Sequence, residues 1–325
     1  MLRQAKTLIY FLDADTVDLG DLNMASLTKA GSYHALRLRS LARLPKNLSR
    51  AEVVISNKFQ LGETQLARLP ALKLICVAAT GVNNVDLDAA QRRGIAVCNV
   101  AAYSTATVAE HAVMFLLALA HRLPEHHRAV LEGAWSQGPH FALLDFPFSD
   151  LVGKKLGILG YGAIGRRVAK LARALGMEIL LGRLPGRSYS PKEKRLSLCS
   201  LLGRSDYVTL HCPLTPQTRH LIDAEKLRWM RPTAYLLNLA RGPIVDEMAV
   251  AAALRAGKLA AYATDVMERE PPSADHPLFS PRLQGKVLFT PHIAWASRES
   301  RQRLIDEIAQ NILSFLRGGK RNRIV

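Results

Sequence analysis

Long apolar runs, an apolar signal region and paired cysteines are all missing from this sequence of 325 residues. The longest apolar stretch, residues 112–120, is too short to cross a bilayer and predicts a buried helix. The first six residues lead straight into the apolar run 8–12, without a separate apolar region and a small-residue cleavage site. These absences argue against a membrane partner and lead us to expect a cytoplasmic protein.

Metal-binding patterns are missing as well. The four cysteines are scattered, with no C-x-x-C pair and no His/Cys spacing suited to zinc: they are Cys76, Cys98, Cys199 and Cys212. We therefore expect reduced, structural thiols and no metal site.

Acidic residues are few relative to basic ones, since 27 Asp and Glu stand against 44 Lys and Arg, a formal net charge of +17. A basic field attracts polyanions, so nucleic acid or an acidic surface is one class of partner to consider. The basic residues are spread along the chain, however, with only residues 320–323 dense, and no nucleic-acid motif accompanies them. The pattern favours a solvated basic surface that steers small anions, and we expect no nucleic-acid partner.

What the sequence does contain is a regular alternation of strand-like and helix-like segments, in a chain long enough for two domains. In the first hundred residues, helix-like stretches such as 62–69 and 87–93 alternate with apolar, β-branched runs at 8–12, 53–55, 74–77 and 95–98. A second series after Gly153 predicts strands near 156 and 179 and at 207–210, 235–238, 261–264 and 287–290. The fold class is therefore α/β, with a doubly wound parallel sheet (Rossmann) as cofactor domain and a flavodoxin-like α/β substrate domain.

The order of these segments predicts that the substrate domain is discontinuous. A long helix over 105–122 can link the two series, and a last helix over 298–316 can pack back on the first. We expect residues 1–100 and 295–325 to form the substrate domain and residues 101–294 the dinucleotide-binding domain. A cleft between two domains is a favoured place for a ligand. The first 50 residues carry no recognisable motif, and residues 36–44, with several arginines, predict an exposed element.

A glycine pattern, G-Y-G-A-I-G, connects the predicted strand near 156 to a helical stretch. This context predicts a dinucleotide-binding site. Gly160 permits a tight turn, Gly162 lets the backbone approach the pyrophosphate of the dinucleotide, and Gly165 lets the helix pack close to the strand. The phosphate then rests on the helix N-terminus, at Ala163 and Ile164. An ordinary glycine-rich turn is the competing interpretation, and the flanking strand and helix weigh against it.

Three side chains at predicted strand ends suit hydride chemistry on a 2-oxo or 2-hydroxy acid. Such an enzyme needs a cation for the substrate oxygens, a proton donor and a group that tunes the donor. Arg241 follows an apolar strand, where open α/β sheets bind ligands, and its guanidinium can hold a carboxylate with two hydrogen bonds. Glu270 and His292 follow the next two strands, and a nearby carboxylate would stabilise the imidazolium that donates the proton. A surface salt bridge is the alternative for Arg241, and Glu270 or His292 alone would more often be structural or solvated.

Seven segments occur in an order that matches a known family: residues 80–86, 108–111, the glycine loop, 210–215, 238–242, 265–271 and 290–294. On these motifs the chain resembles the D-isomer-specific 2-hydroxyacid dehydrogenases over residues 50–315. The segment 80–86, TGVNNVD, and Trp295 are most similar to the glycerate dehydrogenase or hydroxypyruvate (glyoxylate) reductase branch.

The resemblance implies a role for each matching residue of the cofactor domain. Arg241 would bind and polarise the 2-oxo acid, His292 would donate the proton, and Glu270 would hold and tune His292. Asp265 would fix the nicotinamide carboxamide, while Thr107 and the backbone near Cys212 and Ala240 would line the cofactor.

The resemblance also implies substrate contacts from the first domain and a way to pair. The amides around Gly81 and Val82 would grip the substrate carboxylate, and Asn57 and Lys58 would form one wall of the pocket. Trp295 would form another wall or pack at the domain interface, and both interpretations stay open. Relatives usually pair through the cofactor domain, so we expect a homodimer that uses residues 124–150 as its arm.

One position departs from the pattern of NAD-preferring relatives, which carry an acidic residue at the end of the second strand to bind the ribose 2′-hydroxyl. Here the strand 177–181 runs into G-R-L-P-G-R-S, with no acid. Arg183, Arg187 and Ser188 can pair with a 2′-phosphate, and loss of the carboxylate removes the repulsion that rejects it. We therefore expect NADP rather than NAD, and a solvated basic loop without preference is the alternative.

Together these features predict an NAD(P)-dependent reductase of glyoxylate, hydroxypyruvate or another small anionic 2-oxo acid. Two alternatives stay open. A phosphite-type dehydrogenase also presents arginine, glutamate and histidine to an oxyanion, although the segment 80–86 weighs against it. A cofactor-sensing transcriptional corepressor shares the fold, but such proteins usually carry extra interaction segments, and the sequence shows none.

Overall fold

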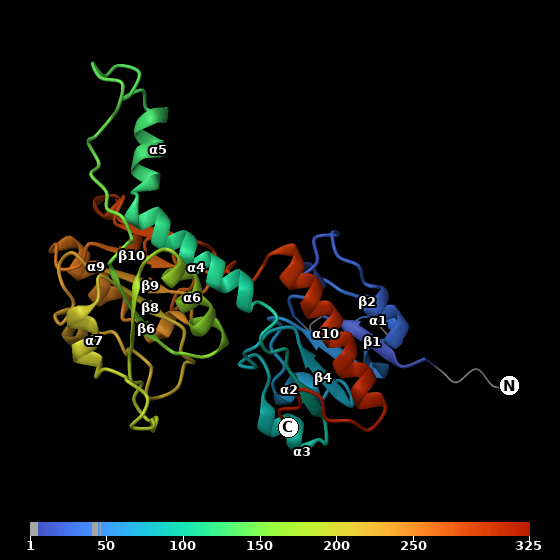
Figure 1. Cartoon of the computed structure of the whole chain (residues 1–325). Helices are drawn as coiled ribbons and strands as arrows, with labels where there is room; N and C mark the ends of the chain where they lie inside the picture. Colours follow the sequence, from blue (N-terminus) through green and yellow to red (C-terminus); the bar gives the residue numbers. More distant parts are fainter. Residues whose placement is uncertain (1–5, 41–44, 46) are drawn as a thin grey trace. The chain divides into compact units, whose positions relative to one another are not determined.

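The computed structural model describes residues 6–40, 45 and 47–325, and the chain divides into two compact units (Figure 1). One unit is Met1–Ser104 with Trp295–Val325, and the other is Thr105–Ala294. Each unit is built on a parallel β-sheet with helices packed against it. The predicted α/β class is therefore confirmed.

The described residues of the first unit form five parallel strands in the order β2-β1-β3-β4-β5. Four lie where apolar runs predict them: β1 (Leu8–Phe11), β3 (Val53–Ser56), β4 (Leu74–Val77) and β5 (Ala96–Cys98). The fifth, β2 (Ser32–Ala35), escapes prediction because its sequence, SYHA, has no apolar run and lies half-buried or exposed at the sheet edge. The unit also holds α1 (Ala25–Ala30), α2 (Glu63–Leu66), α3 (Leu87–Arg92) and 3-10 turns at Ala14–Thr16 and Leu48–Arg50.

The segment 36–44 was expected to form an exposed element, and only part of it is described. Arg37, Arg39 and Ser40 are exposed, whereas Leu36 and Leu38 are half-buried against the core. Residues 41–44 lie outside the described residues.

Helix α10 (Arg298–Leu316), predicted with the same bounds, belongs to this first unit although it ends the chain. Its fully buried Leu304, Ile308 and Ile312 share one core with side chains of β1, β3 and β4. Arg301 adds a two-pronged ion pair with Asp21, with both N–O distances at 2.7 Å. The helix therefore covers one face of the first sheet.

The second unit contains six parallel strands in the order β11-β10-β9-β8-β6-β7, all of them where the sequence predicts them. They are β6 (Lys155–Leu159), β7 (Glu178–Leu181), β8 (Tyr207–Leu210), β9 (Tyr235–Asn238), β10 (Ala261–Thr264) and β11 (Val287–Phe289). Helices α4 (Thr105–Ala120) and α6 (Ala163–Ala174) pack together on one side of the sheet, and α7 (Leu198–Arg204) and α9 (Glu247–Arg255) lie on the other (Figure 1). Shorter pieces are α8 (Ala224–Leu227) and 3-10 turns at Gly242–Ile244, Pro277–Phe279 and Pro281–Leu283.

Two features near the start of this unit differ from the sequence expectations. Helix α4 buries Phe115 and Leu116 but exposes Met114 and Leu117, so residues 112–120 are not buried on every side. A second helix, α5 (Leu123–Leu131), was not predicted, and Pro124 sits in its first turn, where proline is tolerated. Among the described residues no single helix is long and apolar enough to span a membrane; only α4 and α5 together, bent by 61°, pass that test.

The glycine loop joins β6 to α6 as predicted, and its glycines meet different constraints. Gly160 has a φ of +100° and lies against the backbone of His211, which any side chain there would overlap. Gly165 packs on the Gly160 carbonyl and leaves no room for a Cβ atom. At Gly162, by contrast, a Cβ atom would meet no protein atom within 4 Å. The protein alone does not require glycine there, which fits the close approach of a bound pyrophosphate.

The strand order reverses beside this loop. The chain runs from β6 out to β7 and then crosses to β8 on the other side of β6. Open α/β sheets bind ligands at the carboxyl ends of the strands at such a reversal. The first N–H groups of α6, at Ala163 and Ile164, have no acceptor within the helix, and no side chain caps them. A dinucleotide phosphate fits this helix end.

Substituting two of these glycines should separate folding from binding. Gly162→Ser adds a favoured N-cap side chain in open space, so we expect an unchanged melting temperature and at least about a tenfold loss of NADPH affinity. Gly165→Ala should lower the free energy of unfolding by about 1–3 kcal/mol, because its methyl overlaps the Gly160 carbonyl. Thermal unfolding and NADPH titration of both variants measure these effects. Undiminished NADPH binding by Gly162→Ser would contradict the assignment of the loop.

Candidate active site

The three residues predicted to carry the chemistry follow three neighbouring strands. Arg241 comes three residues after β9, Glu270 six after β10 and His292 three after β11. These strands lie side by side in the order β11-β10-β9 and run parallel. The three residues therefore follow the same edge of the second sheet, the carboxyl edge where such sheets bind ligands.

The turn that carries Arg241 is held by a buried asparagine. Asn238 Nδ2 donates to the Arg241 carbonyl at 3.0 Å, and Asn238 Oδ1 accepts from the Ala240 N–H at 3.1 Å. Gly242 lies so close to the backbone of Met267 that a Cβ atom would overlap it. The Arg241 guanidinium donates to the Ala240 carbonyl at 2.7 Å through Nη1, which leaves its other N–H groups for an anion.

Glu270 and His292 are in direct contact. His292 Nδ1 lies 2.6 Å from Glu270 Oε2, and Glu270 Oε1 accepts from the Met267 N–H at 2.9 Å. A carboxylate only accepts, so the Nδ1 proton points at Glu270, and Nε2 is the ring nitrogen that faces away from this carboxylate. The His292 side chain is 25% exposed, which keeps it within reach of a ligand. The structure thus brings this predicted pair together.

Asp265 has contacts that the sequence did not reveal. Its carboxylate is buried and accepts from the N–H groups of Ile293 at 2.8 Å and Ala294 at 2.9 Å, and from the Thr290 hydroxyl at 2.6 Å. An ionised carboxylate can accept about four hydrogen bonds. One acceptor position remains on Oδ2, so the role expected for Asp265 toward the nicotinamide carboxamide fits alongside these contacts.

The other predicted cofactor residues lie at the same edge of this unit. Cys212 and Ala240 are buried directly after β8 and β9. Burial raises the pKa of the Cys212 thiol to about 11, and the nearby charge of Arg187 acts in the opposite direction. Thr107 is half-buried one helical turn before His111, whose side chain meets Thr290. Their roles toward a cofactor stay predictions.

The loop after β7 contains the predicted 2′-phosphate residues and one that was missed. Arg183, Arg187 and Ser188 are exposed. Arg195, whose side chain is only 10% exposed, returns to the end of β7, and its guanidinium lies 4.4 Å from the Tyr189 ring centroid and 5.8 Å from that of Tyr161. Tyr161 belongs to the glycine loop, so Arg195 stands between this loop and the end of β7. Arg195 was not predicted because it is separated from β7 by a loop, and no local pattern indicates that its side chain returns to the end of that strand.

In the first unit, a buried carboxylate shapes the predicted substrate loop. Asp13, which sequence reasoning missed, accepts from the backbone N–H groups of Asn57, Lys58 and Phe59 at 2.7–2.9 Å. The Asn57 side chain is buried and donates to Thr16 Oγ1 at 3.0 Å, whereas Lys58 is exposed. Asn57 therefore has a structural role of its own, and a wall formed by Asn57 and Lys58 remains a prediction.

The remaining residues predicted to contact the substrate also lie in the first unit. Gly81 and Val82 are half-buried in the turn after β4, and Thr80 just before them donates to the Val100 carbonyl at 3.1 Å. Trp295 packs on the core of this unit, with its ring 6.3 Å from that of Tyr103. This contact supports a packing role for Trp295, and the substrate roles of all three residues remain predictions.

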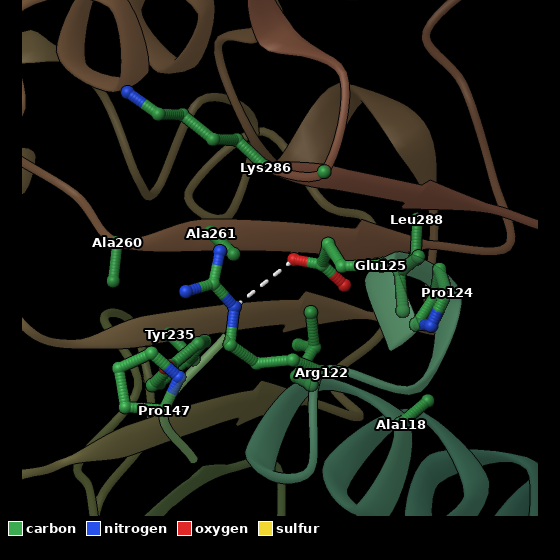
Figure 2. Close-up of a pocket in the computed structure, with 12 residues that line it drawn as sticks. Ala118, Arg122, Pro124, Glu125, Pro147, Tyr235, Ala260, Ala261, Lys286 and Leu288 are labelled. Atoms are coloured by element: carbon green, nitrogen blue, oxygen red, sulfur yellow. Dashed lines mark hydrogen bonds and ion pairs between the residues drawn. The ribbon is translucent and has the colours of Figure 1, made fainter. Parts of the chain in front are cut away.

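A cavity of about 210 Å³ in the second unit lies away from these residues (Figure 2). Tyr235 and Ala261 line it at the starts of β9 and β10, so it opens at the amino edge of the sheet. Figure 2 shows Arg122 and Glu125 facing each other beside it, and Arg122 Nε donates to Glu125 at 3.2 Å. The cavity therefore lies at the opposite edge of the sheet from Arg241, Glu270 and His292.

Comparison with known proteins agrees with this geometry. Residues 113–294 match the family described as D-isomer specific 2-hydroxyacid dehydrogenase, NAD binding domain. The chain is 40% identical over 277 residues to a glycerate dehydrogenase of Methylorubrum extorquens, covering 85% of this chain and 86% of that protein. It is 35% identical to a hydroxypyruvate reductase of Blautia hydrogenotrophica, over 97% of this chain and 98% of that protein. A solved D-lactate dehydrogenase of Aquifex aeolicus, complexed with NAD and lactic acid, is 30% identical with a TM-score of 0.80, covering 98% and 99% of the two chains.

The family match covers more than half of the chain, and the relatives extend over nearly all of it. The resemblance proposed from seven short motifs is confirmed, and with it the enzyme class. The chain belongs to the D-isomer specific 2-hydroxyacid dehydrogenases, a family of NAD(P)-dependent oxidoreductases.

Proposed function

We propose that this enzyme reduces glyoxylate, hydroxypyruvate or another small 2-oxo acid, with His292 as the proton donor. The observation that carries the proposal is the 2.6 Å contact between His292 Nδ1 and the Glu270 carboxylate, at the sheet edge where Arg241 also lies. The names of relatives, glycerate dehydrogenase and hydroxypyruvate reductase, support this substrate class.

In the proposed mechanism, Arg241, His292 and Glu270 each have a separate role in carbonyl reduction. The bound nicotinamide supplies the hydride. The Arg241 guanidinium binds the substrate carboxylate and stabilises the charge that develops on the carbonyl oxygen. His292 gives its Nε2 proton to that oxygen, while Glu270 stabilises the imidazolium through the Nδ1 proton. In the reverse direction, neutral His292 takes the proton back.

His292→Ala should lose about 10²- to 10⁴-fold in turnover, the usual contribution of a general acid, while NADPH affinity persists. Steady-state rates of the wild type and the variant with glyoxylate and hydroxypyruvate, and with phosphite and NADP⁺ for the alternative chemistry, measure this. Unchanged turnover in the variant would remove the assignment.

We propose NADPH as the preferred cofactor. Arg183 and Arg187 are exposed on the loop after β7, and Arg195 stands beside the glycine loop, where the adenosine ribose binds in this fold. The only carboxylate of residues 182–196 is Glu193, and it is already paired with Arg195 at 2.7 Å. The loop therefore offers cations to a 2′-phosphate and no unpaired acid to a 2′-hydroxyl.

The wild type should show a higher kcat/KM with NADPH than with NADH. Replacing Arg183 and Arg187 by alanine should weaken NADPH binding at least about tenfold and leave NADH binding nearly unchanged, because a hydrogen bond to a charged group contributes about 1.5–3 kcal/mol. Lys192→Ala, an exposed cation on the same loop, is the matched control for general charge. A wild type that prefers NADH would overturn the cofactor proposal.

We propose that two copies of the chain pair through α5 and the segment 132–150. Figure 1 shows α5 and the segment after it, in green, extending away from the sheet of their own unit. Large apolar side chains are exposed along them: Leu123, Leu131, Phe141, at 95% exposure, and Leu144. Exposed apolar surface of this kind marks an interaction site, and a second copy carries the same surface for symmetric pairing.

Light scattering of the intact protein should give twice the monomer mass. Phe141→Asp combined with Leu144→Asp should shift it toward the monomer, since each carboxylate would be buried in the interface. Met248→Asp, at a residue of α9 that is also exposed, is the control that should not change the mass. A monomeric wild type would refute the pairing.

A further inference from the structure

We propose that His111 is a positioning residue that acts through Thr290 and Asp265 to hold the turn carrying His292. The inference rests on the proposed role of His292 as proton donor. None of the sequence motifs assigns a role to His111, which stands on α4, far from His292 in the chain.

A continuous chain of polar contacts starts at His111. Its Nε2 atom lies 2.9 Å from Thr290 Oγ1, and the Thr290 hydroxyl donates to Asp265 Oδ1 at 2.6 Å. The His111 and Asp265 side chains are 12% and 3% exposed, and Nε2 lies 4.0 Å from Oδ1. The Phe115 and His111 rings pack edge to face, with their centroids 5.0 Å apart. Buried polar contacts of this kind contribute strongly because water does not compete for them.

The chemistry of the partners sets the direction of each hydrogen bond. Asp265 only accepts as a carboxylate, so the single Thr290 hydroxyl proton is given to it. Thr290 can then only accept from His111, and His111 must carry a proton on Nε2. Burial lowers the pKa of His111, opposed in part by the charge of Asp265, and the neutral ring with its proton on Nε2 satisfies this contact.

The far end of the chain of contacts is the backbone next to His292. Asp265 accepts from the N–H groups of Ile293 and Ala294, the two residues that follow His292. His292 itself has a φ of +56°, a left-handed conformation that costs an ordinary residue about 1–2 kcal/mol. Such a conformation persists where its surroundings hold it. Glu270 holds the His292 imidazole. The contacts that run from His111 through Thr290 and Asp265 hold the backbone next to His292, which orients that imidazole.

The test compares His111→Leu, which removes the donor, with His111→Gln, whose amide can still donate from a similar position. Hydrogen exchange of the Ile293 and Ala294 amides reports on the turn without any turnover, and kinetics with glyoxylate and NADPH give kcat and KM. We expect His111→Leu to speed this exchange and lower kcat about tenfold with little change in the KM for glyoxylate, and His111→Gln to restore both. His121→Leu, at the exposed position directly after the same helix, is the control that should change neither.

Thr290→Val removes the middle link of the same series of contacts and covers the case in which His111→Leu fails to fold. It should speed amide exchange as His111→Leu does. The double variant should exchange little faster than either single variant, since both substitutions interrupt the same series of contacts. The inference would be overturned if the Ile293 and Ala294 amides of His111→Leu or Thr290→Val exchange at the wild-type rate. It would also be overturned if His111→Gln shows the same fast exchange and low kcat as His111→Leu. If His292→Ala keeps its turnover, the proposed function fails instead, whatever the exchange rates show.

Discussion

The turn that carries His292, at the carboxyl edge of the second sheet, depends on the buried carboxylate of Asp265. This carboxylate joins the end of β10 to the residues after β11 through the Thr290 hydroxyl and two backbone N–H groups. Burying a charge costs free energy unless it is hydrogen-bonded, so each of these partners stabilises the buried carboxylate. The residues that follow His292 are therefore held by a buried contact, although the His292 side chain is 25% exposed.

The first unit uses the same device at its own sheet. Asp13 follows β1 and accepts from three consecutive backbone N–H groups after β3, at Asn57, Lys58 and Phe59. In both units a carboxylate beyond one strand holds the loop beyond a neighbouring strand. Loops carry the reactive side chains of α/β folds, and a buried acid makes such a loop part of the core. In both sheets, a buried carboxylate that accepts from backbone N–H groups thus holds a loop at the carboxyl edge.

Different parts of this chain were predictable to different degrees. Strands such as β6 and β9 were predictable because a buried parallel strand is a short apolar run bounded by turn residues. Edge strand β2 was not, because SYHA buries little and its place is decided by pairing with β1. Helix α5 was missed because Pro124, usually a helix breaker, is harmless in the first turn.

The sequence by itself determined the fold class and the glycine loop, and it predicted Arg241, Glu270 and His292 as the catalytic residues, since each depends on residue types within a few positions of a strand end. Only the tertiary structure decided which other side chains lie against the loops that carry the predicted site residues. Asp13, His111 and Arg195 meet partners that lie far away in the chain or across a long loop, and such meetings depend on strand order and helix packing. Local patterns record what a segment can form, whereas a buried hydrogen bond exists only once distant segments are folded against each other.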